Sequence, residues 1–472
     1  MTRTTSCFVL VALTLGLAAV PAQGAVVINI INGDAAGVGF NDPTIVAPVG
    51  GNPGTTIGAQ RLNVFNQAAA IWGAALDSSV PINVQATWEA LTCTATSAVL
   101  GSAGALAVDR DFTLAPFPAT WYHIALANRL AQTDLDPAGN DLRARFNVNL
   151  GNAGCLTGSF FYYGFDHNEG TNVDFLAVLL HEMGHGLGFQ TFTSGTTGAY
   201  FSSFPSAYDH FLRDASTGLL WSDPTETDPQ RVASAITGVG LSWTGASSDA
   251  YGTANMVDSS QLVVTGSVGA NGNYYVGTAS FGPALSTPGV TAPMQLAVDG
   301  TAPVNDACEA LVGFTPGNLC VVDRGVCAFT VKAAACQAAG AVGMIVVDNA
   351  AGVPPPPGLG GTDLTITIPS VRVTLSDGTL IKANLPATGN LSTTSVRKAG
   401  MNIAGQMLLY APSPFQSGSS VSHWDTSATP NLLMEPAINS DLNGTLDATL
   451  ELMRDTGWFA TLPVELMRFE IE

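Results

Sequence analysis

The stretch HEMGHGLGFQT, residues 181–191, carries the pattern that decides the fold. On an α-helix, residues four apart share one face, so His181 and His185 can reach one metal ion while Glu182 projects beside it. Zinc held by imidazoles acidifies a water molecule and polarises a carbonyl group, and a nearby carboxylate can take up the proton. The stretch therefore predicts a zinc-binding helix with Glu182 as general base.

A catalytic zinc ion normally has three protein ligands, and this stretch supplies two. In the extended pattern HExxHxxGxxH, the glycine lets the chain turn out of the helix and the last histidine is the third ligand. Gly188 matches that glycine, but Thr191 stands in place of the histidine. We therefore expect the third ligand to come from elsewhere in the chain.

Two other histidines are candidates for the third ligand. His210 is followed by Phe211 and Leu212, a pattern typical of helix packing. His423 is followed by LLMEP, residues 432–436, which has the form of a tight turn presenting Met434. We favour His423, although single histidines and methionines are also common in protein cores.

These residues resemble the leishmanolysin branch of the metzincin proteases, in which an inserted segment separates the third histidine from the helix. More closely, the chain is similar to exported bacterial metalloproteases of that type. The resemblance extends over GAQRLNVFNQAAAIWG (58–73), FYYGFDHN (161–168) and LDATLELMRDTGW (446–458). It implies zinc ligands His181, His185 and His423, Glu182 as base, and Met434 as an apolar floor beneath the histidines.

The segment 260–397 differs in character, with β-branched strands, four clustered cysteines and an Ala-rich helix predicted over 331–339. VVDRGVCAF (321–329), Lys332, AGA (339–341) and IPSV (368–371) resemble the protease-associated (PA) domain. The resemblance implies a non-catalytic α/β domain that governs substrate access or binds a partner protein. Asp323 and Arg324 could form a binding pair there, but we favour a structural ion pair.

We therefore expect an α+β fold with a divided catalytic domain. The expected parts are a signal peptide (1–24), the first catalytic part (25–259, with the zinc helix at 172–188), the PA domain (260–397) and the second catalytic part (398–472). The metzincin likeness implies a twisted mixed sheet beside the active-site helix. Periodicity predicts helices at 56–76 and 122–131, and strands at 81–88 and 143–150. Thr171 is the expected cap of the zinc helix, and Gly457 is expected to end a last helix at 446–454.

Composition and the N-terminus indicate an exported protein. Residues 1–24 contain Arg3, an apolar run and the small-residue end Ala22-Gln23-Gly24, which predicts a signal peptide cleaved before Ala25. No later run approaches the ~20 apolar residues needed to span a bilayer, so we expect no membrane anchor. The net charge of −20 argues against nucleic acid and anionic membrane surfaces as partners.

After the leader, six cysteines remain, an even number that predicts disulfides in a secreted chain. Their positions favour Cys93–Cys155 and two bridges among the other four: Cys308, Cys320, Cys327 and Cys336. A calcium site is a further possibility at Asp134, Asp136, Asn140 and Asp141. That segment lacks the spacing of a calcium-binding EF-hand loop, so we favour a solvated turn.

The predicted function is that of a secreted zinc endopeptidase acting on proteins or peptides. One rival is an exported binding or adhesion protein with a vestigial zinc site, against which the intact Glu182 argues. Another is a zinc hydrolase acting on non-peptide amides.

Overall fold

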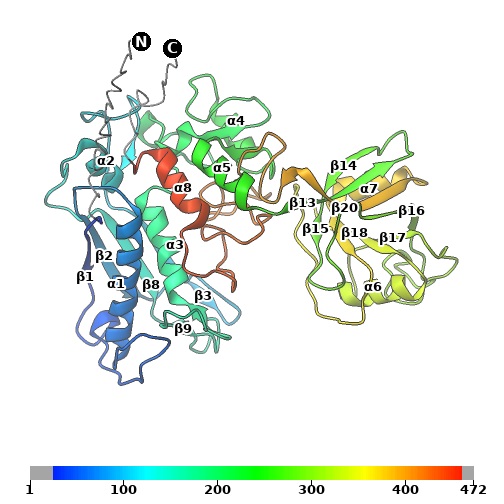
Figure 1. The fold of residues 1–472 in the computed structure, drawn as a ribbon, viewed down its shortest axis with the longest axis horizontal. Coiled ribbons are helices and arrows are strands. Elements are labelled where there is room, and N and C mark those ends of the chain that lie inside the picture. Colours follow the sequence, from blue (N-terminus) through cyan, green and yellow to red (C-terminus); the bar gives the residue numbers. More distant parts are fainter. Residues whose placement is uncertain (1–24, 460–472) are drawn as a thin grey trace, which may run out of the picture.

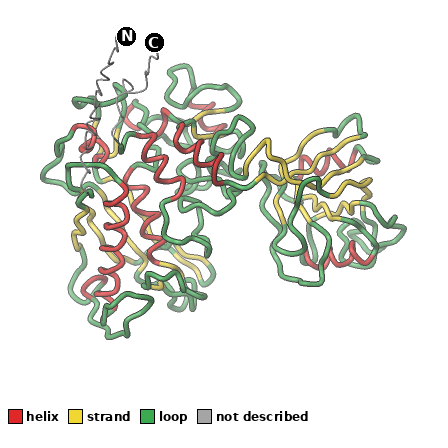
Figure 2. The backbone as a smooth tube through the Cα atoms, in the orientation of Figure 1, coloured by secondary structure: helices red, strands yellow, loops and turns green. Residues whose placement is uncertain are grey.

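The computed structural model describes residues 25–459, which form two units lying side by side (Figures 1 and 2). The hydrophobic core of the first unit draws on residues 26–256 and 401–458, so both ends of the chain build it. The second unit has two cores, both drawn from residues 262–391. The predicted signal peptide lies outside the described residues.

The first unit contains a four-stranded mixed sheet in the order β1-β2-β8-β5. Its strands are β1 (Ile28–Asn32), β2 (Ile82–Glu89), β8 (Leu142–Asn147) and β5 (Gly101–Ala105). The first three are parallel, and β5 runs antiparallel to β8 at one edge. Alternate residues of β2 are buried, as the pattern of its sequence predicted. The edge strand β5 was not predicted.

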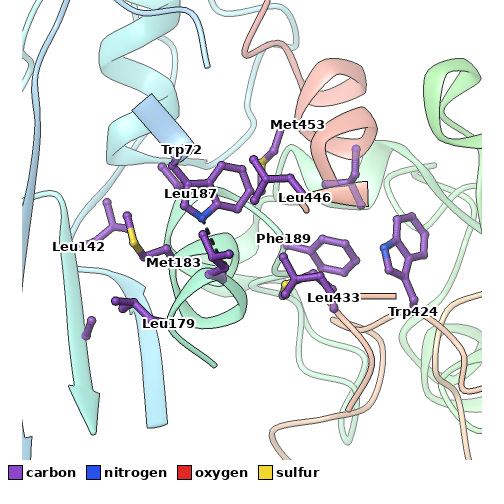
Figure 3. Close-up of a cluster of buried hydrophobic side chains, with 14 of the residues drawn as sticks. Trp72, Leu142, Leu179, Met183, Leu187, Phe189, Trp424, Leu433, Leu446 and Met453 are labelled. Atoms are coloured by element: carbon purple, nitrogen blue, oxygen red, sulfur yellow. Dashed lines mark hydrogen bonds between the residues drawn. The ribbon is translucent and has the colours of Figure 1, made fainter. Parts of the chain in front are cut away.

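Two helices pack together beside this sheet: α1 (Ile57–Ala75) and α3 (Phe175–Leu187). The Trp72 indole on α1 donates a hydrogen bond to Leu180 O on α3 at 3.2 Å. Figure 3 shows Trp72, Met183 and Leu187 within this buried cluster. The helix that carries the HExxH pattern is therefore fully embedded in the core.

The start of α3 corrects the sequence prediction. The helix begins at Phe175 rather than at residue 172, and its N-cap is Asp174 rather than Thr171. Asp174 Oδ1 accepts the Leu176 and Ala177 amides. Val173 and Asp174 pair as β10 with β9 (Phe161–Tyr162), and this extended backbone prevents an earlier helix start.

The first unit has four further α-helices: α2 (Ile124–Ala131), α4 (Asp228–Ser234), α5 (Ala246–Asn255) and α8 (Asp447–Thr456). The predicted helix at 122–131 starts two residues late because Tyr122–His123 forms strand β7. Gly457 has a φ of 110° and ends α8, as predicted.

Three short pairs of strands complete the unit: β3 (Cys93–Thr94) with β4 (Ser97–Ala98), β6 (Val108–Asp109) with β7, and β11 (Leu212–Asp214) with β12 (Leu241–Trp243). Single 3-10 turns lie at Gly39–Asn41, Phe201–Ser203 and Tyr208–His210.

The second unit is built on an eight-stranded sheet in the order β14-β13-β20-β16-β17-β18-β19-β15. The strands are β13 (Asp258–Thr265), β14 (Gly272–Tyr275), β15 (Gly277–Thr278), β16 (Val290–Leu296), β17 (Leu319–Asp323), β18 (Gly343–Val347), β19 (Ser370–Val373) and β20 (Thr388–Lys398). Its helices are α6 (Phe329–Ala338) and α7 (Leu375–Ala383). Cys320 and Val322 share a core with α6, whereas Val321 lies in the other core, with α7. The helices thus cover opposite faces of the sheet (Figure 1).

The chain enters and leaves the second unit at one place. Asp258, at the start of β13, pairs with Lys398, at the end of β20, and their side chains form an ion pair at 2.8 Å. Because the two ends are adjacent, this unit interrupts the first without pulling its two segments apart. Within residues 25–459, no helix has the length and apolar character needed to cross a membrane.

All six cysteines of the described chain form disulfides, as predicted. Cys93 is joined to Cys155 in the first unit. The second unit contains both remaining bridges, Cys308–Cys327 and Cys320–Cys336. These two bridges close overlapping loops, residues 308–327 and 320–336, and the second loop includes most of α6.

Candidate metal and active site

Three histidines meet at the centre of the first unit. His181 and His185 come from α3, and His423 comes from the segment that follows the second unit. The Nε2 atom of His181 lies 3.2 Å from that of His185 and 3.2 Å from that of His423. All three side chains are buried. The structure therefore brings the predicted ligand set together across more than two hundred residues of sequence.

Each imidazole is oriented by a backbone carbonyl. The Nδ1 atoms contact Leu433 O at 2.7 Å for His181, Phe189 O at 2.9 Å for His185, and Ser419 O at 2.7 Å for His423. A carbonyl oxygen can only accept a hydrogen bond, so each Nδ1 must carry the proton. Each Nε2 therefore presents a bare lone pair to the other two.

This donor set fits a zinc ion. The lone pair on His181 Nε2 lies 3.2 Å from those of His185 and His423 and repels them unless a cation lies between the three atoms. Zn–N bonds of about 2.0–2.1 Å in tetrahedral geometry place nitrogen atoms about 3.3 Å apart. Burial lowers the pKa of His181 to about 3 and that of His185 to about 4, and it holds the pKa of His423 well below 6.5. The imidazoles are thus neutral at pH 7, as metal binding requires.

Gly188 supplies the turn that orients His185. Its φ of 135° lies in a region that residues with a Cβ atom rarely adopt, and it ends α3. The next residue, Phe189, donates its amide to Gly184 O at 3.0 Å. Because the chain reverses direction here, Phe189 O lies within hydrogen-bond distance of His185 Nδ1.

The segment 432–435 forms a tight turn beneath the histidines. The Glu435 amide donates to Leu432 O at 3.1 Å, and Met434 is fully buried. The carbonyl of Leu433 in this turn is the one that orients His181. The turn therefore contributes both an apolar side chain and a polar contact.

Thr191 and His210 lie outside the cluster. The Thr191 hydroxyl donates to the buried Asp209 carboxylate at 2.5 Å, so it holds two loops together. The His210 ring is stacked on Phe117 with centroids 3.9 Å apart, and its Nε2 contacts Thr120 Oγ1. Neither residue belongs to the group formed by His181, His185 and His423.

Glu182 lies in the groove beside the histidines. The groove has a volume of about 870 Å³, and residues 97–103 and 417–423 are among those that line it with the three histidines. Burial raises the pKa of Glu182 to about 8, against a backbone hydrogen bond with Ala103 and the charge of Arg145. A cation on the adjacent imidazoles would favour the ionised carboxylate.

The edge strand β5 belongs to this site but is not predicted by its sequence pattern. Five of the seven residues 97–103 are Ser, Ala or Gly, which give little strand signal. Gly101 is needed because a Cβ there would lie 2.7 Å from Phe146 and 3.1 Å from Glu182 Cγ. The close approach of β5 to Glu182 depends on that small residue.

Two other sequence candidates have structural roles. Both Asp141 carboxylate oxygens accept protein hydrogen bonds, from the Asn83 amide and the Asn128 side chain, so Asp141 links the 134–141 segment to β2 and α2. Asp323 pairs with Lys382, and Arg324 pairs with Asp348. Asp323 and Arg324 therefore do not form the structural ion pair with each other that the sequence favoured; each belongs to a separate ion pair.

Residues 290–381 match the PA domain family, so the second unit contains a PA domain. No curated protein matches the chain in sequence.

Among solved structures, a zinc aminopeptidase from Bacillus subtilis is similar at 21% identity and a TM-score of 0.22, over 31% of this chain and 36% of that one. An aminopeptidase from Aneurinibacillus sp. strain AM-1 is similar at 19% identity and a TM-score of 0.21, over 29% and 30% of the two chains. The subtilisin-like protease Apa1 from Pseudoalteromonas sp. AS-11 is similar at 19% identity and a TM-score of 0.23, over 42% and 45%. The chain thus spans less than half of each, and TM-scores of this size do not indicate a shared overall fold.

Proposed function

We propose that this protein is a zinc-dependent endopeptidase of the metzincin type, similar to leishmanolysin, with a PA domain inserted in its catalytic domain. The observation that carries the proposal is the convergence of three proton-free Nε2 atoms, from His181, His185 and His423, beside Glu182 in one groove. The Met434 turn beneath His181 and the turn at Gly188 support the same family.

A zinc ion held by the three imidazoles would supply a Lewis acid that acidifies water and polarises a peptide carbonyl. Glu182 then accepts the proton of the attacking water and delivers it to the departing amine. The carbonyls of Leu433, Phe189 and Ser419 keep the three ligands in the required tautomer throughout.

The edge of the mixed sheet supports a peptide as substrate. Strand β5 pairs with β8 on one side only, and its residues form one wall of the groove above Glu182. An extended peptide can add to such an edge through main-chain hydrogen bonds, which recognise backbone rather than a chain terminus. This arrangement favours internal cleavage of proteins over hydrolysis of small non-peptide amides.

The test is hydrolysis of casein and of a peptide with an acetylated N-terminus. A chelator should abolish cleavage, and added zinc should restore it. Glu182→Gln should keep its zinc but lose about a hundredfold to ten-thousandfold in kcat. The matched control Glu451→Gln, on α8 and paired with Arg454, should retain normal turnover. Failure of the zinc-loaded wild-type chain to cleave either substrate would favour the binding protein with a vestigial site.

A further inference from the structure

A second group of metal-ligand side chains lies in the PA-containing unit, far from the histidines in sequence. Asp299, Asp306 and Glu309 each offer a carboxylate oxygen, and these oxygens all lie within 4.8 Å of one another. They lie on the loop that connects β16 to β17. No part of the proposed catalytic site uses them.

Burial makes this group unlike an ordinary acidic surface patch. Asp299 is 5% exposed and Asp306 is 3% exposed. One oxygen of Asp306, Oδ1, accepts the Cys308 amide, while the other, Oδ2, is buried and has no hydrogen-bond partner in the protein. A buried carboxylate oxygen without a donor costs free energy that a bound cation would recover.

The net charge of this group suits a divalent cation. Lys332 on α6 is fully buried beside this loop, and its ammonium group donates to Asp306 O at 2.6 Å. Three carboxylates against this one ammonium group leave a net charge of two negative. A divalent cation would make the group neutral, which a buried cluster requires.

We propose that Asp299, Asp306 and Glu309 bind one calcium ion that fixes the loop between β16 and β17. Calcium takes oxygen ligands at about 2.3–2.6 Å, so ligand oxygens around one ion lie at most about 5 Å apart. Magnesium is bound through fewer carboxylates and keeps more of its waters, so three carboxylates favour calcium. Glu309 is exposed, so water can complete the coordination on its side.

The loop is already restrained in ways that suit a preformed site. The Cys308–Cys327 disulfide ties it to the segment before α6. Asp299 accepts the Thr301 and Cys308 amides, and the Asp299 amide donates to Val304 O at 3.0 Å. Calcium would therefore bind with little reorganisation of the backbone.

The experiment measures calcium bound by the full chain after metals are removed and zinc is restored. Equilibrium dialysis with calcium chloride, followed by elemental analysis, gives stoichiometry and affinity. We expect one saturable calcium ion per chain, which an equal concentration of magnesium does not displace. Hydrogen exchange at residues 297–312 should slow when calcium is bound.

Two variants test the ligands, and one serves as control. Asp306→Asn should weaken calcium binding by at least about tenfold. Glu309→Gln, at an exposed position, should weaken it by a smaller factor. Asp136→Asn, in the acidic turn of the first unit, should bind as the wild type. Absence of saturable binding, or wild-type affinity in both Asp306→Asn and Glu309→Gln, would overturn the proposal, as would loss of binding in Asp136→Asn alone.

Discussion

The Sδ atom of Met434 lies 2.8 Å from the point that a Cβ atom on residue 184 would occupy. Gly184 stands between Met183 and His185 on α3, and Met434 is fully buried beneath it. Because Gly184 has no side chain, the Met434 turn packs directly against the backbone of α3. That contact brings Leu433 O within 2.7 Å of His181 Nδ1.

Gly184→Ala should therefore lower stability and zinc affinity. Alanine favours a helix over glycine by about 1 kcal/mol, but overpacking in a core costs about 1–3 kcal/mol, so the steric cost should prevail. Urea unfolding followed by tryptophan fluorescence measures the effect. All seven tryptophans lie outside residues 260–397, so the signal reports the first unit alone.

A double-mutant cycle with Met434→Ala is the control for Gly184→Ala. The new methyl group would occupy part of the space that Met434 vacates, so the double variant should be more stable than the sum of the two single changes predicts. If the two changes in the free energy of unfolding were strictly additive, residues 184 and 434 would not be in steric conflict in Gly184→Ala.

Asp447→Asn should loosen the Met434 turn. Asp447 Oδ2 accepts the Leu433 amide at 2.6 Å, and Oδ1 accepts the Thr449 amide at 3.0 Å. An asparagine has one acceptor oxygen, so one of these amides loses its partner, at a cost of about 1–3 kcal/mol. Because the same turn orients His181, zinc affinity should fall by about 10-fold to 100-fold.

Competition for zinc with a fluorescent chelator measures the affinity of Asp447→Asn. The control is Asp441→Asn in the preceding loop, where the exposed carboxylate bonds only to the Asn431 side chain. Equal zinc affinity in the two variants would show that Asp447 does not support the site.

The metal-free protein should lose stability as the pH falls below about 6.5. Burial lowers the pKa of His123 from 6.5 to about 3, so between these values the unfolded chain binds more protons than the folded chain. The stability that this residue contributes is complete above pH 6.5 and declines toward pH 3. At pH 5, His123 alone should lower the free energy of unfolding by about 2 kcal/mol.

His123→Gln should therefore flatten the pH dependence of unfolding. Urea titrations of the metal-free wild type and variant at pH 7 and pH 5, followed by tryptophan fluorescence, measure the difference. If both chains lose the same stability between these pH values, His123 is not held neutral by burial.

Much of the first unit could be predicted because its signals are local. The apolar period of residues 56–76 predicted α1, the alternation in 81–88 predicted β2, and the spacing of His181 and His185 placed both on one helical face. Each of these patterns lies within a single element. The cysteine positions likewise predicted Cys93–Cys155 and two bridges among the other four cysteines, but they left the pairing of those four open.

The parts that escaped prediction depend on contacts between distant segments. Every residue has a carbonyl, so nothing in the sequence marks Leu433, Phe189 and Ser419 as the acceptors that orient the histidines. The start of α3 was misplaced because pairing of β10 with β9, a tertiary contact, overrode the capping signal at Thr171. The small residues of β5 fit a strand only because they pack against Glu182 and Phe146.

The central claim is that one zinc ion joins His181 and His185 to His423 across the inserted unit. The most direct measurement is zinc content per chain after dialysis of His423→Ala beside His210→Ala, with tryptophan fluorescence as a check that both have folded. The account predicts one zinc in His210→Ala, whose ring only stacks on Phe117, and almost none in His423→Ala. Full zinc in folded His423→Ala, with loss in His210→Ala, would contradict it.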